Sequence, residues 1–131
     1  MLALQRATHA TLLVLASRLS DLHLSASEIN ALANLADDRA RTISELGVAV
    51  GTRPTTLTSI LDRLEARGHI TRGSRAGNRR VVVVELTESG RAAAATISQA
   101  ISELEHQALA GLPTEALASL RAALQALTEV S

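Results

Sequence analysis

The stretch of sequence that decides the fold is residues 42–90, TISELGVAVGTRPTTLTSILDRLEARGHITRGSRAGNRRVVVVELTESG. Its pattern predicts two short helices, an arginine-rich hairpin and the capped start of a long helix. This order of elements can lay one helix in a groove of DNA with an arginine-bearing loop beside it. The same stretch holds more than half of the basic residues of the chain.

Charge is distributed unevenly along a chain whose formal net charge is zero. Residues 53–80 contain seven arginines against Asp62 and Glu65, a net charge of +5. Residues 1–52 sum to −1 and residues 81–131 sum to −4. This separation predicts a local anion-binding face on a mildly acidic body.

Composition excludes several kinds of site. The chain has no Phe, Tyr or Trp, so it lacks the stacking platforms that bind single strands and RNA loops, and double-stranded DNA is the expected polyanion. It has no Cys, which excludes a disulfide, a thiol sensor or a thiolate metal site. The apolar run at residues 11–16 is too short to span a bilayer and is not followed by a leader cleavage site. We therefore expect a single cytoplasmic domain of 131 residues.

Apolar spacing and capping residues predict five or six helices. One apolar stripe on the first helix consists of Leu12, Leu15, Leu19 and Leu22. Two capping-box patterns, Ser25–Glu28 and Thr42–Glu45, open the second and third helices. Gly51 permits a tight turn after the third helix. Pro54 suits the first turn of the next helix and Gly68 ends it.

Helical geometry decides which side of the predicted helix 52–68 faces solvent. Its apolar stripe is Leu57, Ile60, Leu61 and Leu64. Thr55 and Ser59 lie on the opposite face, with Thr56 and Arg63 beside them. Small hydroxyl side chains let a helix approach DNA closely, and the helix start suits phosphate. A soluble surface helix without a partner would have the same pattern, so this helix alone does not decide the function.

A hairpin is predicted after this helix. The segments His69–Arg72 and Val81–Leu86 are rich in β-formers, and the turn-forming residues 73–78 lie between them. Four arginines, at positions 72, 75, 79 and 80, occupy the hairpin, and no acidic residue occurs between positions 68 and 84. An exposed arginine-rich tip can enter the minor groove of DNA. A solvated charged face is the alternative, but such faces usually mix signs, so the hairpin favours DNA binding.

The terminal helices predict a dimer. Thr87 can cap a long helix that reaches about Leu112, and Pro113 separates it from a last helix. These two helices and the first have more apolar surface than a small winged domain can cover. We therefore expect them to pack against a second copy of the chain, with an intramolecular bundle as the alternative. The predicted dimerisation residues are Leu12, Leu15, Leu19, Ile97, Ile101, Leu104, Leu117, Leu120, Leu124 and Leu127.

The chain resembles the MarR-type winged helix-turn-helix transcription regulators. The likeness rests on RPTTLT at residues 53–58, DRLEARG at 62–68, NRR at 78–80 and LTESG at 86–90, and it runs through essentially the whole chain in helix order. Its specific part is the wing pattern, usually written D-x-R-x5-L-T, combined with the D-R-L-E-x-x-G helix end.

This resemblance implies a mainly α fold with a small β-hairpin wing and terminal dimerisation helices. Residues 25–86 would form the winged helix-turn-helix DNA-binding lobe, and residues 1–24 and 87–131 the dimerisation helices. It also implies an obligate dimer whose recognition helices read adjacent major grooves while the wings touch minor grooves. Two readers about 34 Å apart would match a pseudopalindromic site.

The resemblance places five of the candidate residues on the recognition helix and makes Arg80 the wing arginine. The full candidate DNA-binding set is Arg53, Thr55, Thr56, Ser59, Arg63, Arg72, Arg75, Asn78, Arg79 and Arg80. Two of these depart from the family pattern. Asn78 replaces the usual wing aspartate, so a charge pair with a recognition-helix arginine becomes at best a neutral hydrogen bond. Ser59 stands where a longer polar or basic reader is common.

We therefore expect a homodimeric regulator of double-stranded DNA that acts as a repressor and needs no cofactor. The resemblance implies a small anionic or apolar effector between the dimer helices and the DNA-binding lobe, and without aromatic residues that pocket must be aliphatic. A winged helix that binds protein is the alternative. The four histidines form no metal-binding spacing, and residues 103–106 could bind a metal only with help from another helix. No phosphate loop, nucleophile elbow or acid–base pair indicates an enzyme.

Overall fold

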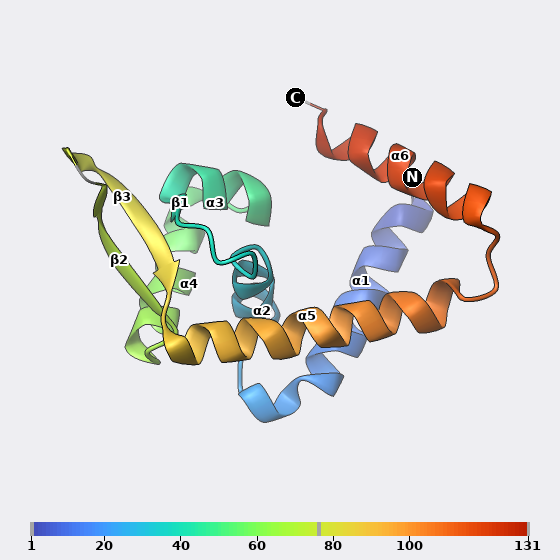
Figure 1. Cartoon of the computed structure of the whole chain (residues 1–131), viewed down its shortest axis with the longest axis horizontal. Helices are drawn as coiled ribbons and strands as arrows, with labels where there is room; N and C mark the ends of the chain where they lie inside the picture. Colours follow the sequence, from blue (N-terminus) through green and yellow to red (C-terminus); the bar gives the residue numbers. More distant parts are fainter. Residues whose placement is uncertain (1, 76, 131) are drawn as a thin grey trace. The chain divides into compact units, whose positions relative to one another are not determined.

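The computed structural model describes residues 2–75 and 77–130. The helices are α1 (Leu2–Arg18), the 3-10 turn η1 (Ser20–Leu22), α2 (Ala26–Ala33), α3 (Ile43–Val50), α4 (Pro54–Ala66), α5 (Glu88–Leu109) and α6 (Thr114–Thr128) (Figure 1). The strands are β1 (Arg41–Thr42), β2 (Ile70–Arg75) and β3 (Asn78–Leu86). The predicted mainly α fold with a small hairpin is confirmed. The chain divides into two compact units, residues 1–101 and 102–131, and α5 runs from the first into the second.

Capping residues set the starts of α2 and α3. The Ser25 hydroxyl accepts the Glu28 N–H at 3.2 Å, and the Glu28 carboxylate accepts the Ser25 N–H at 3.1 Å, so the predicted capping box is complete. The Thr42 hydroxyl accepts the Glu45 N–H at 3.1 Å, but it donates to the Glu45 carboxylate itself. Only half of the second predicted box therefore forms, at a threonine that also ends strand β1.

Three antiparallel strands form a sheet in the order β1-β3-β2. The predicted hairpin is confirmed, but its strands are longer than predicted, because most of the expected loop at residues 73–78 joins the ladder. A register irregularity between Ser74 and Arg75 absorbs the mismatch. Gly77 has a φ of 82° in the turn, where a residue without a side chain is favoured. Strand β1 was not expected, since two residues give no periodic signal.

The core of the first unit is centred on α4. The four apolar residues predicted to face inward, Leu57, Ile60, Leu61 and Leu64, are all buried. Leu32, Leu46 and Val84 join them as fully buried side chains from α2, α3 and β3. Full burial of such a side chain stabilises the fold by about 1.5–3 kcal/mol. The orientation of α4 about its own axis is therefore fixed by its packing.

Three predicted dimerisation residues are instead part of the core of one chain. The exposed fractions of Leu15, Leu19 and Ile97 are 8%, 4% and 0%. These three side chains are covered within the protomer, so they are not available to a second copy. Leu120, Leu124 and Leu127 of α6 are 37–42% exposed, and Leu12, Ile101, Leu104 and Leu117 are half-buried.

Within the described part of the chain, no helix is long and apolar enough to cross a membrane.

The start of α5 is in direct backbone contact with the corner between α4 and β2. The Thr87 hydroxyl accepts the Gly90 N–H at 3.0 Å and donates to the Gly68 carbonyl at 2.5 Å. The Thr87 N–H donates to the His69 carbonyl at 3.0 Å. A β-carbon at Gly90 would lie 1.8 Å from the His69 carbonyl oxygen. Close packing therefore requires glycine at position 90 of the LTESG motif. Thr87 of the same motif joins this corner through its hydrogen bonds.

We predict that Gly90→Ala lowers the free energy of unfolding by about 3 kcal/mol, because the added methyl group meets backbone that cannot rotate away. Urea denaturation followed by circular dichroism measures the change. Gly111→Ala is the matched control, since nothing lies within 4 Å of a β-carbon placed there. Equal stability of the two variants would contradict the proposed close approach.

Candidate nucleic-acid interface

The first half of α4 shows small hydroxyl side chains and one arginine to solvent. Arg53 is the N-cap residue and makes no side-chain capping hydrogen bond, and Pro54 supplies no N–H at the first position. Thr55, Thr56 and Ser59 are exposed, opposite the buried stripe. The helix start therefore combines uncapped backbone amides with a guanidinium, which suits a phosphate group.

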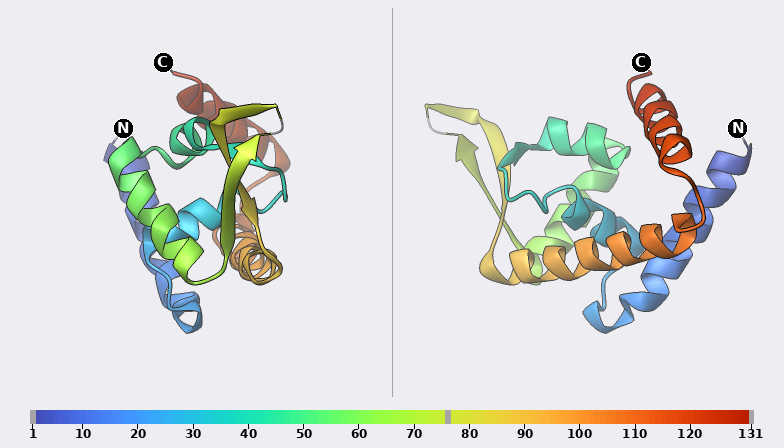
Figure 2. Two further views of the ribbon diagram at one scale, coloured as in Figure 1. Left: turned by 90° about the vertical axis from the view of Figure 1, so that its left-hand side faces the viewer. Right: turned by 45° about the vertical axis from the view of Figure 1, so that its right-hand side comes forward.

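The hairpin of β2 and β3 extends past α3 and α4, with its tip away from the helices (Figures 1 and 2). Arg75, Arg79 and Arg80 are exposed on it. The Asn78 side-chain oxygen accepts the Arg80 N–H at 3.0 Å. Asn78 therefore shapes the backbone of the wing, and among the described residues it forms no hydrogen bond with an arginine of α4.

Arg72 joins the wing to α4 and differs in this from the other wing arginines. Its guanidinium lies 2.8 Å from an Asp62 oxygen and 2.9 Å from a Glu65 oxygen, and its side chain is 23% exposed. The hydrogen bond from Arg72 holds the pKa of Glu65 below its usual range. The same two carboxylates raise the pKa of Arg72. These contacts hold the wing against α4, and contact of Arg72 with DNA stays a prediction.

Three further arginines of the basic segment have partners inside the chain. Arg63 lies 3.7 Å from the buried Glu28 carboxylate, and Arg75 lies 4.0 Å from Glu45. The Arg67 guanidinium donates to the carbonyls of Leu22 and His23, so it ties the end of α4 to the connection before α2.

The remaining three arginines of the segment, Arg53, Arg79 and Arg80, form no ion pair with any residue that the structure describes. The net charge of +5 in the sequence therefore overstates the free positive charge of this surface. The free charge is concentrated at two places, the start of α4 and the second strand of the wing. Both places are also exposed, which an anion-binding surface requires.

Metal binding finds no support in the geometry. Over residues 2–75 and 77–130, no group of three or more His, Asp or Glu side chains could hold a metal ion. The segment 103–106, which we considered as a metal site if another helix contributed, acquires no such neighbours.

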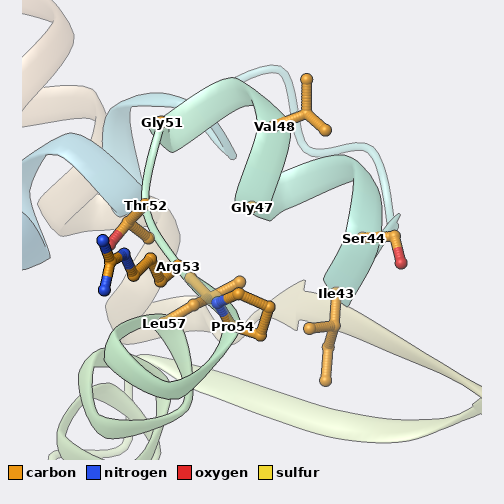
Figure 3. A pocket seen from close by; sticks show the side chains of 9 residues that line it. All are labelled: Ile43, Ser44, Gly47, Val48, Gly51, Thr52, Arg53, Pro54 and Leu57. Atoms are coloured by element: carbon orange, nitrogen blue, oxygen red, sulfur yellow. The ribbon is translucent and has the colours of Figure 1, made fainter.

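Among the pockets of the first unit, two lie next to the start of α4. The larger, about 530 Å³, lies between α3 and the start of α4 (Figure 3). The smaller, about 230 Å³, is lined by Leu12 of α1, by α2 residues including Asn30, by the turn at 50–52 and by Ile60. The larger has mainly aliphatic walls, whereas the smaller mixes the polar side chains of Ser27, Asn30 and Thr52 with aliphatic ones. The smaller one lies where the effector was expected, between the first helix and the winged lobe.

Comparison with known proteins agrees with the predicted resemblance. Residues 24–82 match the model of the MarR family. NadR in complex with 4-hydroxyphenylacetate is similar over 99% of this chain and 92% of its own, with 22% identity and a TM-score of 0.90. CouR from Rhodococcus jostii RHA1, bound to p-coumaroyl-CoA, covers 98% and 91% with 21% identity and a TM-score of 0.87. A mutant MarR from E. coli, complexed with operator DNA, covers 95% and 90% with 24% identity and a TM-score of 0.79. Comparison with curated protein sequences gave no significant match.

Proposed function

We propose that this chain is a sequence-specific regulator that binds double-stranded DNA as a homodimer. The match of residues 24–82 to the MarR family model and the similarity of the fold to NadR support this proposal. One observation carries the proposal: Arg53 at the start of α4 and Arg79 and Arg80 on β3 are exposed and have no carboxylate partner among the described residues. They accompany a helix face of small hydroxyl side chains. Unpaired guanidiniums on a hydroxyl-bearing surface suit a phosphate backbone.

The two sites of free charge have different tasks in this proposal. The first turn of α4 enters the major groove, where Thr55, Thr56 and Ser59 approach phosphates and base edges. Arg79 and Arg80 on the wing reach the adjacent minor groove, where a narrow A/T-rich stretch concentrates negative potential. The ion pair of Arg72 with α4 supports this division, because it limits how far the wing can swing relative to the helix.

The dimer is supported by α6. None of the described residues of this helix is buried, and Leu120, Leu124 and Leu127 are each more than one-third exposed. Three leucines at helical spacing form an apolar stripe that a second copy would cover. A two-fold dimer then presents two recognition helices to one face of the duplex and selects a pseudopalindromic operator.

Repression that a small molecule relieves is the regulatory mode that we favour. The relatives support it, since NadR and CouR are seen with organic ligands and MarR with operator DNA. An effector in the pocket formed by Leu12, Asn30 and Ile60 would change the spacing of the two readers, and DNA would be released because both half-sites must be met together. This function places the protein in the cytoplasm with the DNA.

Selection of bound fragments from a genomic or randomised DNA pool tests the function. We expect enrichment of one pseudopalindrome whose half-sites lie about one helical turn apart. Recovery of unrelated sequences, or of none, would contradict specific DNA reading and favour a winged helix that binds protein instead.

We predict that Arg80→Ala weakens binding to the selected site at every salt concentration. It should also reduce the slope of log affinity against log salt by about one unit, because one phosphate contact and its released counterion are lost. Fluorescence-anisotropy titrations between about 50 and 200 mM salt measure both quantities. Arg6→Ala serves as the comparison, and its slope should equal that of the wild type, since Arg6 is an exposed arginine of α1 outside both places of free charge. An unchanged slope in Arg80→Ala, with folding intact, would sink the wing assignment.

We predict that Leu124→Glu raises the dimer dissociation constant roughly 100-fold, because dimerisation would bury an unpaired carboxylate. Analytical ultracentrifugation gives the constant, and circular dichroism shows whether the helices remain. Ala122→Glu is the control, since position 122 lies on the opposite face of α6. A folded Leu124→Glu variant that dimerises as tightly as the control would remove this stripe from the interface.

A further inference from the structure

We infer that the DNA which this chain selects is recognised by its pyrimidine C5-methyl groups, those of thymine, in the major groove beneath the first half of α4. The methyl groups of Thr55 and Thr56 are the protein atoms that would touch them. This inference rests on the proposed DNA-binding function and names the base feature that the function reads. The contacts of the wing with the minor groove are independent of it.

The first half of α4 has only short side chains to offer to a base. Residues 54–61 contain no Arg, Lys, Asn, Gln, Asp or Glu, which are the residues whose hydrogen bonds identify a particular base in the major groove. Recognition helices contact base edges through their N-terminal residues. The exposed side chains on this part of the solvent face are Thr55, Thr56 and Ser59.

Packing and hydrogen bonding leave these three hydroxyl side chains available. Burial of the apolar stripe fixes which face of α4 points to solvent. The Thr58 hydroxyl, on the flank, donates to the Pro54 carbonyl at 2.9 Å. The side chains of Thr55, Thr56 and Ser59 form no hydrogen bond with any residue that the structure describes. They can therefore turn toward a base without breaking an internal contact.

Methyl groups discriminate between bases where hydroxyl groups do not. A hydroxyl both donates and accepts, so it finds a partner on any base pair in the major groove. Thymine alone among the four bases carries a methyl group in that groove, and contact between two methyl groups removes apolar surface from water. Ser59 adds no bulk that would hold the helix away. The base pairs beneath Thr55 and Thr56 are therefore read as T·A by methyl contact.

The longer polar side chains near this face have other places. Arg53 lies before the first turn of α4 (Figure 3), and Arg63 lies in the last turn, 3.7 Å from the buried Glu28 carboxylate. Asn78 is the one amide side chain in residues 35–98. Its oxygen accepts the Arg80 N–H at 3.0 Å within the wing, whereas recognition of adenine uses both the oxygen and the nitrogen of an amide. Methyl contact is thus the discriminating interaction that the first half of α4 can make.

The test uses the full-length protein and the operator recovered by selection. Deoxyuridine replaces thymidine at one symmetric pair of positions at a time. This change removes a methyl group from the major groove and leaves base pairing and the minor-groove edge unchanged. At one or more pairs, we expect binding to weaken about fourfold per methyl group, or roughly 15-fold for a symmetric pair. Replacing dC by 5-methyl-dC in a C·G-substituted operator should restore about fourfold per methyl group at the same positions.

Two double variants separate the methyl groups from the hydroxyl groups. Thr55→Ser with Thr56→Ser keeps both hydroxyls and removes both methyls, so it should bind the thymidine and deoxyuridine operators equally, within about twofold. Thr55→Val with Thr56→Val keeps the methyls and should retain the preference for thymidine. Thr96→Ser is the control, since this exposed threonine lies on α5 and its hydroxyl donates to the Ala92 carbonyl. Circular dichroism checks that each variant is folded.

Three results would each overturn the inference. The first is an operator in which no deoxyuridine substitution changes the affinity by more than about twofold. The second is a serine double variant that still prefers thymidine, and the third is a valine double variant that has lost the preference. In all three cases the wild type still binds a defined sequence, so the proposed function stands. A selection that recovers no common sequence refutes the proposed function itself and this inference with it.

Discussion

Burial of the apolar stripe on α4 is the constraint on which the rest of the structure depends. Leu57, Ile60 and Leu64 are sealed in the core, so the helix cannot rotate about its own axis without exposing them. The opposite face is thereby committed to solvent along its whole length. Its first half carries hydroxyl groups, and its second half carries carboxylates that Arg72 neutralises. Packing and electrostatics together leave the start of the helix as the part that we propose to bind anions.

Arginine serves two separate purposes in this chain. Some guanidiniums hold elements together: Arg67 donates to carbonyls before α2, and Arg72 joins β2 to α4. Arg53, Arg79 and Arg80 remain without carboxylate partners among the described residues, and these three form the proposed contact surface. A wing held by such a pair samples fewer orientations than a free hairpin, so the proposed binding to DNA would cost less conformational entropy. Arg72 thus limits the movement of the hairpin that carries Arg79 and Arg80.

Local signals predicted what depends on local spacing. The stripe of α4, the Ser25 capping box and the hairpin were all predicted, because helix periodicity, caps and turn residues act within a few positions. The burial of Leu15 and Ile97 was not predicted, since an apolar stripe does not say whether its cover comes from the same chain or from a second one. The partners of Arg72 lie seven and ten residues away, on another element, and only the tertiary fold brings them together. The pocket between α3 and the start of α4 was not predicted either, because its walls come from two helices that only the tertiary fold places side by side.

The backbone contact between Gly90 and the His69 carbonyl has a mechanical meaning. At Gly90 the backbone of α5 meets the His69 carbonyl directly, so no rotamer change can absorb a displacement at that contact. Thr87 adds hydrogen bonds to the Gly68 and His69 carbonyls. The start of α5 and the corner after α4 are therefore expected to move together rather than as a hinge. A tilt at the beginning of α5 is therefore transmitted to the end of α4 with little loss. Compliance in this protein has to reside elsewhere along the chain.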